Sequence, residues 1–156
     1  MEVNKIISHA LQSMPPSKRQ KAFAKDTSKL IHMGLNENNY GMSPKAVAAL
    51  EDSMAGSHFY PDFAAVLLKQ KVAEQYGLKA ENVLTGAGSS AMIDMIGLTF
   101  LDEGDEVLFS APTYGAFADM AYLNGGVPVS VPVTEEQKFN LPAMKEKIGE
   151  KTKIVV

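Results

Sequence analysis

Two glycines and two serines interrupt an apolar stretch near the middle of the chain. Val83-Leu84 is followed by Thr85-Gly86-Ala87-Gly88-Ser89-Ser90 and then by the apolar segment 92–100. This pattern predicts a short strand, a tight turn and a new helix that Ser89 or Ser90 caps. The first turn of a helix presents unpaired backbone N–H groups and the positive end of the helix dipole. We therefore predict that this turn binds an anion, most simply a phosphate.

Strands and helices alternate at short intervals around the turn. The apolar periodicity and the turn residues predict helices over 3–11, 43–56, 62–77, 114–123 and 141–148, and strands over 31–35, 106–109, 127–133 and 153–156. Short strands that alternate with helices are typical of a parallel sheet with crossover helices. The predicted fold class is therefore α/β.

Several side chains have predicted structural roles in these helices. Val47, Ala48, Leu50 and Met54 are expected to form the buried face of the helix over 43–56, because they recur at helical spacing. Asp62 is expected to cap the next helix, which stops at Gly77. Methionines such as Met92 and Met95 are expected to fill the core.

Composition excludes several classes of function. The net charge is −3, and Arg19 is the only arginine, which argues against binding to nucleic acid or to an anionic membrane. The chain has no cysteine, and its three histidines lack metal-ligand spacing, so no metal site is predicted. No apolar run reaches the roughly 18 residues that a membrane span needs, and no signal peptide is evident, which fits the cytoplasm.

The turn also matches a loose dinucleotide-binding pattern, G-x-G-x-x-G/A, over residues 86–91. That pattern requires an acidic residue at the carboxyl end of the second strand, whereas Asp105 and Glu106 lie at its amino end. A dinucleotide is therefore not favoured. Ligands still bind at the carboxyl ends of parallel strands. We thus expect the glycine turn to lie beside the turn over 111–114, with the Tyr114 ring against a phosphorylated ligand.

Five segments in this order resemble a known family. They are Leu35-Asn36-Glu37-Asn38-Asn39-Tyr40-Gly41, Tyr60-Pro61-Asp62, Asn82-Val83-Leu84-Thr85-Gly86-Ala87-Gly88-Ser89, Gly104-Asp105-Glu106-Val107 and Pro112-Thr113-Tyr114. The sequence resembles the class I/II aminotransferases of fold type I, and within them the histidinol-phosphate aminotransferase-like subgroup. The resemblance implies a three-layer α/β sandwich with a mostly parallel sheet, pyridoxal 5′-phosphate as cofactor, and transamination between a small-molecule amino donor and a 2-oxo acid acceptor.

The resemblance assigns cofactor-binding roles to individual residues. Gly88, Ser89 and Ser90 match the turn that holds the cofactor phosphate, and Tyr114 matches the aromatic residue that stacks on the pyridine ring. Tyr60 matches a tyrosine that reaches the cofactor phosphate of the neighbouring subunit, which implies a homodimer with shared sites.

The resemblance also places Asn36 and Asn38 in the loop that lines the substrate side. The chain departs from the family in three places. Ser90-Ala91 stands where an acidic pair is common, and its hydroxyl is a good phosphate donor. Phe59 replaces an arginine, and Met14-Pro15-Pro16 replaces a Pro-Tyr pair that helps to recognise histidinol phosphate. The substrate therefore stays open between an amino acid and an amino-alcohol phosphate.

The resemblance places no catalytic residue within this chain. The lysine that binds the cofactor covalently would follow Val156, and Lys145, Lys147, Lys151 and Lys153 are expected to face solvent. The chain ends on Ile154-Val155-Val156, which is typical of a buried strand. We expect the N-terminal part of a longer protein, with a helix and arm over 1–30 and part of the large cofactor domain over 31–156. This chain alone is predicted to be inactive.

Two alternative functions remain at the level of sequence. One is a decarboxylase of the same fold that acts on a phosphorylated amino acid. The other is a non-catalytic phosphate-binding α/β module, or a dimerisation fragment, that is complete as it stands. The apolar final strand favours an enzyme fragment, because a complete domain rarely exposes an apolar strand edge.

Overall fold

A computed structural model describes residues 7–15, 33 and 36–156, and these fall into two compact units. The sheet unit comprises 84–156 together with the start of the chain up to Pro16, and the helical unit comprises 17–83. The predicted arm over 17–29 and most of the predicted strand over 31–35 lie outside the described residues. Of the predicted helix over 3–11, the described part is a short helix α1, His9–Ser13.

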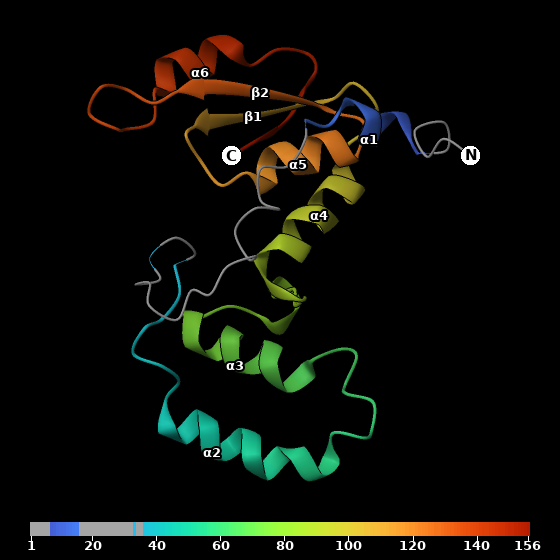
Figure 1. Cartoon of the computed structure of the whole chain (residues 1–156), viewed down its shortest axis with the longest axis vertical. Helices are drawn as coiled ribbons and strands as arrows, with labels where there is room; N and C mark the ends of the chain where they lie inside the picture. The colour runs from blue at the N-terminus through green and yellow to red at the C-terminus, as the bar shows by residue number, and fades with distance from the viewer. Residues whose placement is uncertain (1–6, 16–32, 34–35) are drawn as a thin grey trace, which may run out of the picture. The chain divides into compact units, whose positions relative to one another are not determined.

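The sheet unit is built on three parallel strands (Figure 1). These are β1 (Glu106–Ala111), β2 (Val127–Pro132) and β3 (Thr152–Val155), in the order β2-β1-β3. Helix α5 (Ala116–Leu123) connects β1 to β2, and α6 (Leu141–Lys147) connects β2 to β3. Helix α4 (Gly88–Phe100) precedes β1. The prediction of an α/β fold with a parallel sheet and crossover helices is confirmed.

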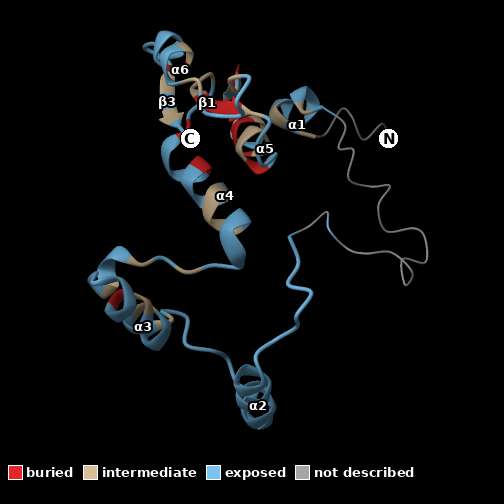
Figure 2. Cartoon of the chain, turned by 90° about the vertical axis from the view of Figure 1, so that its left-hand side faces the viewer, coloured by how far each residue is buried: buried red, intermediate tan, exposed pale blue. Residues whose placement is uncertain are grey.

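The two faces of β1 carry different side chains, because successive residues of a strand point to opposite faces. Val107 and Phe109 pack on one face with Met120 and Ala121 of α5, and Ile93 of α4 packs against the same cluster. Figure 2 shows this buried centre in red at β1 and α5. Helices α4 and α5 therefore cover one face of the sheet.

The second face of β1 packs against α6. Leu108 forms a buried cluster with Val131 of β2 and Met144 of α6. The buried hydroxyl of Ser110 lies on this face and donates to the Met144 sulfur at 3.4 Å. With helices on both faces, the sheet unit has the predicted three layers.

In its described residues, the helical unit contains two helices and two short 3₁₀ turns. Helix α2 (Pro44–Ser53) runs into η3 (Met54–Gly56), and α3 (Val66–Tyr76) is followed by η4 (Ala80–Asn82). The N-cap residue of α3 is Ala65 rather than the predicted Asp62, but Asp62 does bind the start of the helix, since its carboxylate accepts from the backbone N–H groups of Ala64 at 2.9 Å and Val66 at 2.8 Å. The predicted end of α3 at Gly77 is confirmed.

The predicted buried face of α2 is not buried. Val47, Leu50 and Met54 are 39%, 54% and 68% exposed, and Ala48 is exposed as well. Helical periodicity identifies which face of a helix suits a core, but burial requires a partner that covers it. Among the described residues, none of α2 is buried.

Two apolar segments differ from their predicted form. Val83-Leu84 is not a strand, and Leu84 is 71% exposed, since the described sheet consists of β1, β2 and β3 alone and offers this segment no hydrogen-bonding partner. The segment over 153–156 does contribute to β3 (Thr152–Val155), but Val155 is 53% exposed rather than buried, because the described residues do not fully cover the face of the sheet on which it lies.

Candidate functional site

The first turn of α4 is open to an anion. The helix begins at Gly88 after the N-cap residue Ala87, and no side chain caps it. Gly88 has a φ of +82°, and the space around its Cα is open. The backbone N–H groups of Ser89 and Ser90 lie in the first turn, where no helical carbonyl is available to accept them. A phosphate fits such an uncapped, positively polarised turn.

The two serines lie two and three positions past the N-cap residue rather than at the cap position itself. The sequence predicts that Ser89 or Ser90 caps the helix, whereas the cap position is Ala87 and both serines belong to the first turn. The left-handed conformation of Gly88 explains the difference, because the chain enters the helix directly from this residue. Both hydroxyls therefore remain available for contacts outside the helix backbone.

The loop after β1 brings Tyr114 to this turn. The side-chain oxygens of Ser90 and Tyr114 lie 2.9 Å apart and share a hydrogen bond, although the two residues are 24 positions apart in the sequence. The Tyr114 ring also meets the Phe117 ring edge-on, with 6.2 Å between the ring centres. The prediction that the glycine turn lies beside the turn over 111–114 is confirmed. The hydrogen bond itself was not predicted, because no sequence spacing indicates it.

The other candidate residues lie in the helical unit. Tyr60 is 88% exposed, and its ring lies 5.8 Å from that of Phe63. Asn38 closes a local turn, since its side-chain nitrogen donates to the Gly41 carbonyl at 2.7 Å. Asn36 adopts a φ of +54°, which asparagine tolerates better than most residues. The cofactor role of Tyr60 and the substrate role of the two asparagines stay predictions.

The acidic residues beside β1 have structural partners. Asp105 accepts from the Asp102 backbone N–H at 3.0 Å and pairs with Lys153 at 3.7 Å. Glu106 accepts a hydrogen bond from the Thr152 hydroxyl at 3.3 Å. Both carboxylates thus support the amino end of β1, away from the carboxyl end where a ribose would bind. This placement agrees with the rejection of a dinucleotide site.

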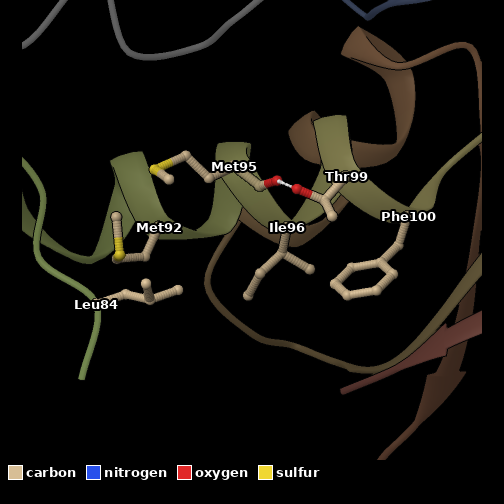
Figure 3. A pocket seen from close by; sticks show the side chains of 6 residues that line it. All are labelled: Leu84, Met92, Met95, Ile96, Thr99 and Phe100. Carbon is tan, nitrogen blue, oxygen red and sulfur yellow. Dashed lines mark hydrogen bonds between the residues drawn. The ribbon is translucent and has the colours of Figure 1, made fainter. Parts of the chain in front are cut away.

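An apolar pocket runs along one side of α4 (Figure 3). It is lined by Leu84, Met92, Met95, Ile96, Thr99 and Phe100. The prediction that Met92 and Met95 fill the core is wrong: Met92 is only half-buried and Met95 is 47% exposed. Their side of α4 faces the open pocket rather than the cluster around β1. The Thr99 hydroxyl donates to the Met95 carbonyl at 2.6 Å, so the pocket offers little to orient a polar ligand.

Two further kinds of feature are absent from the part of the chain that the structure describes. No group of three or more histidine, aspartate or glutamate side chains there is arranged to hold a metal ion. Within the same residues, no helix has both the length and the apolar character that crossing a bilayer requires.

Comparison with known families matches residues 28–156 to the model for aminotransferase class I and II. The chain belongs to this family. Over 120 residues it is 32% identical to histidinol-phosphate aminotransferase 2 of Carboxydothermus hydrogenoformans, covering 77% of this chain and 33% of that protein. It is 33% identical, also over 120 residues, to an aromatic amino acid aminotransferase of Corynebacterium glutamicum, covering 77% of this chain and 35% of that protein.

A solved aminotransferase has the same fold. The structure of histidinol-phosphate aminotransferase from Sinorhizobium meliloti, a complex with pyridoxal 5′-phosphate, aligns with a TM-score of 0.79 at 21% identity. The alignment covers 94% of this chain and 40% of that one. The predicted fold type I architecture is therefore confirmed. This chain spans about a third of the length of the curated aminotransferases that it matches.

Proposed function

We propose that this chain contributes the phosphate-binding and ring-binding part of a pyridoxal 5′-phosphate site in an aminotransferase. The observation that carries the proposal is the uncapped first turn of α4 with Tyr114 hydrogen-bonded to it through Ser90. Membership of the aminotransferase class I and II family supports the choice of cofactor.

The residues at this turn fit the cofactor. Its phosphate would accept from the backbone N–H groups of Ser89 and Ser90, where Gly88 leaves open space for close approach. The exposed ring of Tyr114 would stack on the pyridine ring, a contact worth about 1 kcal/mol beyond burial. When bound, the cofactor supplies an electron sink for the reacting carbon. The chain's own residues hold it, orient it and exclude water from one ring face.

The proposed reaction exchanges an amino group between a small-molecule donor and a 2-oxo acid. The donor is an amino acid or an amino-alcohol phosphate, in line with relatives that are named for histidinol phosphate and for aromatic amino acids. Asn36 and Asn38 would line the substrate side. Tyr60 would contact the cofactor phosphate of a second subunit, so that the working form is a cytoplasmic homodimer with shared sites.

The proposal also predicts that the isolated chain has no aminotransferase activity. None of the four lysines near the end of the sequence lies in a sequence motif that matches a cofactor-binding lysine. They are Lys145, Lys147, Lys151 and Lys153. Moving the substrate proton needs a positioned base, and a lysine commonly serves in such a role. The chain of 156 residues should therefore bind the cofactor without turning over substrate.

The test compares two proteins. The natural protein that contains this chain is purified, loaded with pyridoxal 5′-phosphate and given 2-oxoglutarate with L-histidinol phosphate or L-phenylalanine. We expect glutamate formation, and none from the chain of 156 residues alone. A natural protein that binds inorganic phosphate but neither binds the cofactor nor forms glutamate would contradict the proposal and support a non-catalytic phosphate-binding module. Carbon dioxide release in place of glutamate would indicate the decarboxylase.

A further inference from the structure

We propose that Ser90 is a positioning residue: its hydroxyl holds the ring of Tyr114 in place over the anion-binding turn. This inference rests on the proposed function and deepens it. It assigns to Ser90 a task beyond contact with a phosphate, namely that of coupling the ring-binding residue to the phosphate-binding turn.

The geometry supports a hydrogen-bonded link between two separate elements, and we call this link between Ser90 and Tyr114 the brace. Ser90 lies in the first turn of α4, and Tyr114 lies in the loop between β1 and α5. Their hydroxyl oxygens are 2.9 Å apart. Tyr114 is 46% exposed, so packing alone does not enclose its ring. The edge-on contact with Phe117 holds one side of the ring, and the bond to Ser90 holds the hydroxyl end.

The hydrogen-bonding capacity of the two hydroxyls determines how the brace responds to a phosphate. A serine hydroxyl has one proton and two lone pairs, and a tyrosine hydroxyl also donates and accepts. A phosphate at the first turn of α4 favours donation of the Ser90 proton to its charged oxygens. Ser90 then accepts from Tyr114, so that the order of donation is Tyr114 to Ser90 to phosphate. Phosphate binding and ring position are thereby coupled through a single hydroxyl.

A double-mutant cycle tests this coupling. Ser90→Ala and Tyr114→Phe each remove one side of the bond, and Tyr114→Phe keeps the aromatic ring. The probe is pyridoxamine 5′-phosphate, whose amine does not condense with surface lysines, titrated into the full chain of 156 residues. We expect Tyr114→Phe to weaken binding about fivefold, the net value of one hydrogen bond, and Ser90→Ala to weaken it more, because that substitution also removes the proton donated to the phosphate. The double substitution should weaken binding no further than Ser90→Ala does, and Ser90→Thr, which retains a hydroxyl, should restore most of it.

Independent effects of the two substitutions on cofactor binding would overturn the inference. If Ser90 acts only on the phosphate, the two single effects multiply in the double variant. If the unsubstituted chain does not bind pyridoxamine 5′-phosphate at all, the proposed cofactor site fails, and the cofactor role of the brace fails with it. The first result leaves the cofactor site intact, so the two failures are distinguishable.

A second readout needs no ligand. NMR of ¹³C-labelled tyrosine in the ligand-free chain, with the Tyr114 signals assigned through Tyr114→Phe, reports the mobility of that ring. Ser90→Ala should increase its mobility, whereas Ser130→Ala, at an exposed serine of β2 in the same unit, should leave it unchanged. Equal ring mobility in the unsubstituted chain and in Ser90→Ala would contradict the brace.

Discussion

A Cβ atom placed on Gly97 of α4 would lie 2.5 Å from the Cγ of Met120 in α5, so the two helices approach each other closely at this glycine. The same atom would lie 2.5 Å from the side-chain nitrogen of Asn124. Helix α4 begins at the anion-binding turn, and α5 follows Tyr114 in the chain. Packing at Gly97 therefore joins the two helices that adjoin the two parts of the candidate site.

Gly97→Ala should destabilise the chain despite the higher helix propensity of alanine. We expect a loss of about 1–3 kcal/mol in the free energy of unfolding, because the added methyl group overpacks the contact with Met120. Urea unfolding followed by circular dichroism measures it. Gly149→Ala is the matched control, since a Cβ there meets nothing within 4 Å. Equal stability of the two variants would show that α4 and α5 do not pack as described.

Leu108→Ala should lower the free energy of unfolding more than the truncation of an exposed leucine does. Leu108 is 1% exposed between β2 and α6, so its truncation leaves a cavity and should lower the free energy of unfolding by about 2–5 kcal/mol. Leu98→Ala, at a leucine of α4 that is 76% exposed, is the comparison and should change little. The same urea titration compares them, and a similar loss in both variants would argue against the second core.

Asp62→Ala should loosen the start of α3. The substitution removes both carboxylate acceptors from the N–H groups of Ala64 and Val66, a loss of about 1 kcal/mol for a helix cap. Hydrogen exchange should speed up at the Val66 amide and stay unchanged in β1. Asp62→Asn retains one acceptor oxygen and should show a smaller effect. Unchanged exchange at Val66 in Asp62→Ala would count against the cap.

Gly88→Ala should strain the turn before α4. Its cost arises from the φ of +82° alone, since a Cβ there meets nothing within 4 Å, and a left-handed alanine costs about 1–2 kcal/mol. Asparagine tolerates this conformation better, so Gly88→Asn should lose less stability. Thermal unfolding of both variants checks the order, and the reverse order would indicate a different backbone at residue 88. Both should also weaken binding of pyridoxamine 5′-phosphate, because the first-turn N–H groups shift.

Sequence patterns predicted the helices and strands over residues 88–156. The run over 106–109 became part of β1, because Val107, Leu108 and Phe109 place apolar side chains on both faces and two strands and three helices surround them. The rule that ligands gather at the carboxyl ends of parallel strands placed the loop of Tyr114 beside the glycine turn, and the bond to Ser90 confirms it.

Predictions of burial, which require another element to cover the residue, were less successful. The apolar residues of α2, the pair Val83-Leu84 and the methionines of α4 were expected to be buried or paired, and in the described residues they are largely exposed. Apolar character shows that a surface favours contact, but it does not show which element provides the contact. The hydrogen bond between Ser90 and Tyr114 was missed for a related reason, since it depends on how two elements 24 residues apart pack together.

Titration of ¹⁵N-labelled chain with pyridoxamine 5′-phosphate tests the central claim most directly, namely that the first turn of α4 binds the cofactor phosphate. The account predicts that the amide signals of Ser89 and Ser90 are among those that shift most, and that pyridoxamine, which lacks the phosphate, binds about tenfold more weakly or worse, because charge-assisted hydrogen bonds are lost. The claim would be contradicted if the signals of these two amides stayed in place while others shifted, or if both compounds bound with equal affinity.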